Sequence, residues 1–168
     1  MKLDLYTFVG LYSKGLEALV QILTKGAAYA SDIGASEKEM LAWRIAPDMF
    51  PLLRQAQIVC DLAVKWTARS AGLAPPEAPA GDQSLAELHA AIEDARNFLE
   101  RLRPEQLEGR HEVPLKLQIG ELEPTMPLGQ WVSGFATTNF YFHLSMAYAI
   151  LRMKGVPLGK RDLLAGGL

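Results

Sequence analysis

The sequence predicts an all-α protein, a four-helix bundle with a small β-hairpin inserted between the third and fourth helices. Four segments place apolar residues at steps of three and four, the spacing of one helix face. Prolines and glycines separate them, and a stretch before the last segment alternates apolar and polar residues instead. For a chain of 168 residues we expect a single domain, residues 1–168, around one core.

The first two helices are expected over residues 3–30 and 36–70. The first carries one apolar stripe, and the second begins with a capping-box pattern, a serine followed three residues later by a glutamate. Pro47 and Pro51 interrupt the second helix. Because proline removes an amide donor and clashes with the preceding turn, we expect a break or kink across residues 45–51.

The second half of the chain predicts a loop, a helix, a hairpin and a final helix. Residues 72–81 contain three prolines and form a loop within the domain. A second capping box opens a helix over residues 84–103. Residues 113–126 alternate with period two and predict two short strands. The fourth helix is expected over residues 128–154 and ends before Gly155.

Composition and charge exclude several classes of protein. The net charge of −2 argues against nucleic acid as a partner, because binding a phosphate backbone needs an excess of cations. Cys60 is the single cysteine, so no intrachain disulfide can form. With no signal peptide at the N-terminus, this predicts a cytoplasmic protein. Residues 131–151 carry no charge, but their polar residues argue against a membrane span and predict a helix buried on most sides by protein.

Polar residues on two apolar stripes predict a small site inside the bundle. On the second helix Asp48 and Gln55 share a face, with Arg44 one turn before. On the fourth helix Asn139 and His143 share a face. Because buried polar groups need partners, we expect the two stripes to meet.

His143 is the residue in this set that could act as a general base or metal ligand. Asp48 could orient it, or could instead form a structural pair with Arg44. The alternative for His143 is a core histidine hydrogen-bonded to Asp48, Asn139 or a tyrosine. Tyr12 and Trp43 are candidates for the mouth of a ligand pocket.

Two segments carry a resemblance to a known family. Residues 44–52, Arg-Ile-Ala-Pro-Asp-Met-Phe-Pro-Leu, precede Gln55, and residues 139–143, Asn-Phe-Tyr-Phe-His, precede two further matching stretches at 147–152 and 155–160. Together they resemble an uncharacterised bacterial family within the DinB/YfiT-like superfamily. The resemblance implies an up-down-down-up four-helix bundle and a homodimer. It also implies a divalent metal held by three histidines in many members, and thiol-dependent transferase or isomerase activity in some.

Carried over by position, the metal triad of the superfamily falls on Gln55, Asn139 and His143. The pair Leu151-Arg152 sets this register, because the superfamily has a Leu-Arg pair about two turns after its last histidine. Amides replace two of the three imidazoles, and amides are weak ligands for Zn²⁺ or Ni²⁺. The resemblance and this departure together predict a polar pocket without metal, with a Zn²⁺ or Ni²⁺ site as the alternative.

Three functions remain open on the sequence. The first is a small-molecule binding module with a degenerate, metal-free site. The second is an enzyme, thiol-dependent or hydrolase-like, that uses His143 as base with Asp48 or Asn139 to orient it. The third is a structural homodimer, with the helix at 131–151 and the first helix as contact faces.

Overall fold

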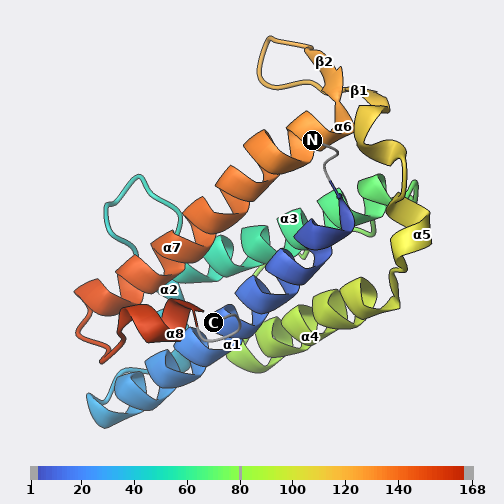
Figure 1. Cartoon of the computed structure of the whole chain (residues 1–168). Helices are drawn as coiled ribbons and strands as arrows, with labels where there is room; N and C mark the ends of the chain where they lie inside the picture. The colour runs from blue at the N-terminus through green and yellow to red at the C-terminus, as the bar shows by residue number, and fades with distance from the viewer. Residues whose placement is uncertain (1–3, 80, 165–168) are drawn as a thin grey trace.

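The computed structural model describes residues 4–79 and 81–164 and consists mainly of a bundle of four long helices (Figure 1). The four are α1 (Tyr6–Asp32), α3 (Leu52–Ser70), α4 (Leu85–Arg101) and α7 (Thr137–Met153). The short elements are α2 (Glu37–Ala42), α5 (Pro104–Leu107), a 3₁₀ turn (Arg110–Glu112), β1 (Pro114–Lys116), β2 (Thr125–Pro127), α6 (Leu128–Gln130), a π-helical segment (Trp131–Ala136) and α8 (Lys160–Leu164). The predicted bundle with a hairpin before its last helix is confirmed.

The four long helices run up, down, down and up. Helices α3 and α7 are antiparallel, because Trp66 near the end of α3 stacks on Trp131 just before α7, whereas Gln55 near the start of α3 reaches His143. Helices α3 and α4 are parallel, because Gln57 in the second turn of α3 donates to Gln83, which lies just before α4. This topology brings the two polar stripes together across the α3–α7 contact.

The break at the two prolines is larger than a kink. Helix α2 follows the capping box of Ser36 and Glu39, as predicted, and ends at Ala42. The chain is then non-helical until α3 begins after its N-cap residue, Pro51. Residues 43–51 therefore form a loop between two helices. The expected break is present, and it begins at Trp43, two residues before the predicted span of 45–51.

The other predicted boundaries shift by a few residues. The first helix extends to Asp32, and its expected start at residue 3 lies outside the described residues. Helix α4 opens with the predicted capping box and ends at Arg101. In the hairpin, Leu115 pairs with Met126, and an isolated bridge joins Ile119 to Leu122 nearer the turn.

The last helix contains a π-helical segment that the sequence did not predict. Within it Trp131 is fully buried, and its indole N–H donates to the carbonyl of Leu115 in β1 at 2.8 Å. At its C-terminal end the Thr137 hydroxyl donates to the carbonyl of Val132, five residues earlier, at 2.7 Å. Such π-helical segments commonly mark functional sites, and this one lies one turn before the predicted site residues of α7.

The helix over 131–151 is not buried on most sides, contrary to the expectation. Its inner face carries Phe140, which is fully buried, but Phe135, Tyr141 and Phe142 are 37%, 39% and 51% exposed. The absence of charge in this segment therefore reflects an apolar outer face as well as a core face. None of the helices over residues 4–79 and 81–164 is both long enough and apolar enough to cross a membrane.

Candidate functional site

Gln55 and His143 meet at the contact between α3 and α7. The distance between Oε1 of Gln55 and Nδ1 of His143 is 2.7 Å. Gln55 is 2% exposed, whereas His143 is half-buried. The structure thus brings together two of the three positions to which the resemblance assigned the metal triad, and it joins them to each other.

The hydrogen bonds of Gln55 determine which nitrogen of His143 carries the proton. The Gln55 amide nitrogen donates to the carbonyl of Phe50 at 3.2 Å, so the amide oxygen is the atom that faces the imidazole. A carbonyl oxygen can only accept, and Nδ1 of His143 must therefore be the donor. In the neutral ring, Nε2 then holds the lone pair, and it is the nitrogen available to a ligand.

The surroundings also favour the neutral form of His143. Burial lowers the pKa of its imidazole, and the positive charge of nearby Arg54 lowers this pKa further. The ring of Phe142 meets the imidazole edge to face, with centroids 5.1 Å apart. The arrangement can therefore present a neutral acceptor at Nε2, beside an aromatic side chain and a cation.

Asn139 does not join the pair. Its amide nitrogen donates to the carbonyl of Phe135 one turn earlier in the same helix, at 2.8 Å. The third triad position is therefore bonded to its own helix, although Asn139 shares a face with His143, as predicted.

The donor set does not fit a Zn²⁺ or Ni²⁺ ion. The Gln55 oxygen and the His143 Nδ1 are already bonded to each other, which leaves one imidazole nitrogen and the weak amide oxygen of Asn139. No group of three or more His, Cys, Asp or Glu side chains within the described parts of the chain could hold a metal ion.

Asp48 and Arg44 are not on the helix that carries Gln55. Both are exposed in the loop before α3, and Arg44 bonds to the carbonyl of Pro47 at 3.4 Å. The prediction that Asp48 shares a helix face with Gln55 is wrong, because Pro51 starts the helix after it. The imidazole Nδ1 is bonded to Gln55 rather than to Asp48. Arg44 lines a separate cavity of about 520 Å³ between α2 and the starts of α3 and α4.

Tyr12 and Trp43 have other places in the fold. Tyr12 is fully buried, packs on Phe140 and shares a hydrogen bond of 3.0 Å with Thr137, so it does not line a pocket mouth. Burial raises the pKa of the Tyr12 phenol to about 12. Trp43 is partly buried, and the ammonium group of Lys154 lies 5.6 Å from its ring centroid.

Sequence reasoning missed two contributors to the site, Arg54 and the carbonyl of Phe50. Arg54 directly precedes Gln55, and its charge could have been noted there. The Phe50 contact carries no side-chain signal, because it uses the backbone and depends on the shape of the loop before α3.

Comparison with known proteins identifies the family. The model of the family described as "Domain of unknown function (DUF1993)" matches residues 5–164. A crystal structure described as a DinB family member protein from Shewanella denitrificans is 32% identical in sequence, with a TM-score of 0.89 over 95% of this chain and 91% of that one. None of the curated proteins matches the chain. The chain therefore belongs to the DUF1993 family, an uncharacterised DinB-like family, and has the DinB-like four-helix-bundle fold that the resemblance implied.

Proposed function

We propose that this protein is a small-molecule binding module whose site is the Gln55–His143 pair and which works without a metal. The observation that carries the proposal is the bond of 2.7 Å between Gln55 Oε1 and His143 Nδ1. This bond joins the Gln55 oxygen to the His143 Nδ1 and leaves Nε2 as a hydrogen-bond acceptor.

The surroundings of Nε2 indicate what the ligand must offer. An acceptor nitrogen needs a donor, so the ligand carries an O–H, N–H or S–H group. Arg54 favours a weakly acidic donor, because its positive charge stabilises the ligand as the donor loses proton density to Nε2. The exposed ring of Phe142, which meets the imidazole edge to face, provides apolar surface for the rest of the molecule.

The test uses a set of phenols, alcohols and thiols with protein labelled with ¹⁵N at its histidines. We expect at least one class to shift the Nε2 resonance of His143, and the replacement His143→Phe to abolish binding. His111→Gln is the matched control, because His111 lies in the turn before β1, outside this site. Fragments that bind while the His143 resonance stays unchanged would overturn the proposal.

Metal content is tested separately on untagged protein grown in metal-replete medium without chelator. We expect no Zn, Ni, Mn or Fe above background, for the reason given by the donor set. About one metal ion per chain that disappears in His143→Ala would contradict the metal-free site.

The same geometry supports an enzyme as the second candidate. A neutral imidazole with Nδ1 bonded to an oxygen and Nε2 free is the arrangement of a general base. In a thiol-dependent transferase, Nε2 would take the proton of a low-molecular-weight thiol as its sulfur attacks. Turnover that is lost in His143→Gln, with binding retained, would favour this candidate over a binding module.

We also propose that the protein is a homodimer, and the exposed aromatic side chains on the last helix support this. Phe135, Tyr141 and Phe142 lie on a helix without charge between residues 131 and 151, and apolar exposed faces of this kind commonly mark protein contacts. A purely structural role for His143 is less well supported, because the ring is only half-buried.

We also propose a cytoplasmic location, which fits the single, reduced and buried cysteine.

A further inference from the structure

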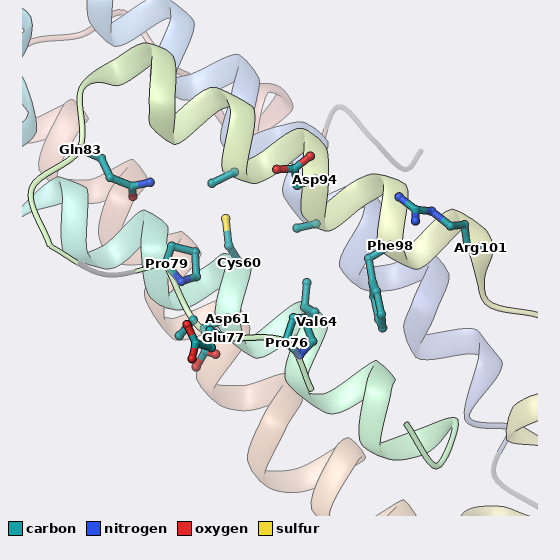
Figure 2. A pocket seen from close by; sticks show the side chains of 13 residues that line it. Cys60, Asp61, Val64, Pro76, Glu77, Pro79, Gln83, Asp94, Phe98 and Arg101 are labelled. Atoms are coloured by element: carbon teal, nitrogen blue, oxygen red, sulfur yellow. The ribbon is translucent and has the colours of Figure 1, made fainter. Parts of the chain in front are cut away.

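A second cavity, of about 460 Å³, lies between α3 and α4 (Figure 2). It is on the side of α3 that faces α4, whereas Gln55 and His143 lie between α3 and α7. Its apolar lining comes from both helices and from the loop that joins them: Val64, Pro76, Pro79, Ala91, Ala95 and Phe98. The cavity is therefore separate from the Gln55–His143 site.

The course of the chain explains why space remains here. Because α3 and α4 are parallel, the loop between them must return along their whole length, and it covers the groove between the two helices. Gln57 holds the far end of this loop through bonds to the carbonyl of Gly81 at 3.0 Å and to Gln83 at 2.9 Å. On the α4 side the wall is formed by small residues, Ala91 and Ala95, which leave a gap under the prolines. Proline brings no N–H that would need a partner against an apolar wall.

The rim of the cavity is acidic. Asp61, Glu77 and Asp94 line it, one each from α3, the loop and α4. Asp61 is neutralised by Lys65 at 2.7 Å, but in the described parts of the chain neither Glu77 nor Asp94 has a cation within 4.0 Å. Arg101, the cation among the lining residues, comes from the end of α4, and its guanidinium turns back along the helix to donate to the carbonyl of Asn97 at 3.1 Å (Figure 2).

We propose that this cavity binds a small amphiphilic cation, with its apolar part between α3 and α4 and its ammonium group at Glu77 and Asp94. The volume lies within the usual range of ligand pockets, roughly 300–1,000 Å³. Apolar walls with two unpaired carboxylates at the rim favour an amine over an acid or an alcohol of the same length. The proposal does not depend on the function of the Gln55–His143 site.

The test is calorimetric titration of the full chain with octylammonium, octanol and octanoate. We expect octylammonium to bind, octanol to bind more weakly and octanoate to bind least. Ala91→Trp, which fills the cavity, should abolish binding. Ala90→Trp is the matched control, because Ala90 is its exposed neighbour on the same helix, and it should bind as the wild type does. Equal binding of the three probes, or binding that survives Ala91→Trp, would overturn the proposal.

A further measurement leaves the wall of the cavity unchanged. Glu77→Gln combined with Asp94→Asn should reduce the preference for octylammonium over octanol by about tenfold, because it removes two carboxylates from the rim. An unchanged preference would refute the proposal.

Discussion

Replacing Gln55 by Glu should reverse the effect of the site on the charge of His143. The change keeps the length of the side chain but places a carboxylate against Nδ1, where the wild type has an amide oxygen at 2.7 Å. It also removes the donor to the Phe50 carbonyl. The wild-type site lowers the pKa of His143 through burial and Arg54, and the variant adds an opposing charge in direct contact.

The size of the effect follows from the geometry. Two opposite charges about 4 Å apart gain about 4 kcal/mol at an effective dielectric constant of about 20. His143 is only half-buried, so solvent screens part of this energy. We expect the pKa of His143 in Gln55→Glu to lie about one to two pH units above that of the wild type.

The stability of the two proteins should therefore depend on pH with opposite signs. In the wild type the folded pKa lies below the unfolded value of 6.5, so the unfolded state binds more protons and the protein loses stability as the pH falls through 6.5. In Gln55→Glu the folded pKa is expected above 6.5. The stabilisation from the pair is then fully present below that value and is lost as the pH rises through the folded pKa.

Nitrogen-detected NMR of labelled histidines measures this pKa directly, and His89 and His111 serve as internal references. Urea unfolding between pH 6 and pH 8 checks the sign of the stability change. If the His143 pKa is unchanged in Gln55→Glu, the two side chains are not in contact in solution and the deduced tautomer is wrong.

Three further predictions concern the fold and the assembly. Gly15→Ala should lower the free energy of unfolding by about 1–2 kcal/mol, because a Cβ there would lie 2.4 Å from the buried ring of Phe140. Gly10→Ala has open space at that position and should raise the free energy of unfolding by up to about 1 kcal/mol. Urea melts of the two variants measure both changes. Ser84→Ala removes the cap of α4 and should cost about 1 kcal/mol in the same assay. Light scattering on a sizing column should give a dimer, and Phe142→Ser should shift it toward the monomer of 18.5 kDa; a monomeric wild type would refute the dimer.

The parts of the fold that were predictable are those that depend on local sequence. Both capping boxes hold the helix starts where they were expected, because the serine and glutamate that form them are three residues apart. The sequence also predicted that the polar stripes of the second and fourth helices meet. It did not predict Gln55 as the hydrogen-bond partner of His143, because it gave Asp48, Asn139 or a tyrosine for that role.

The errors occur where tertiary contacts or a change in the path of the backbone determine the position of a residue. Asp48 was placed on a helix face by extending the spacing of α3 backwards through Pro51, although a proline is a natural first-turn residue and marks a helix start. Tyr12 was a candidate for the mouth of a ligand pocket, but it is fully buried, and Thr137 provides a hydrogen-bond partner for its hydroxyl. That partner is positioned by the π-helical segment before α7, which has no recognisable sequence signal.

The carried-over triad positions can be tested by restoring the imidazoles. Gln55→His combined with Asn139→His would place two histidines four residues apart on α7 and a third across from them on α3, at the contact already made by Gln55 and His143. Three imidazoles and an open fourth position suit Zn²⁺. The double variant should bind about one zinc ion per chain in equilibrium dialysis, and each single variant should bind more weakly. A double variant that folds but binds no zinc would show that residue 139 cannot turn from the Phe135 carbonyl toward α3, and the metal-free site would then result from backbone geometry rather than from the amide side chains.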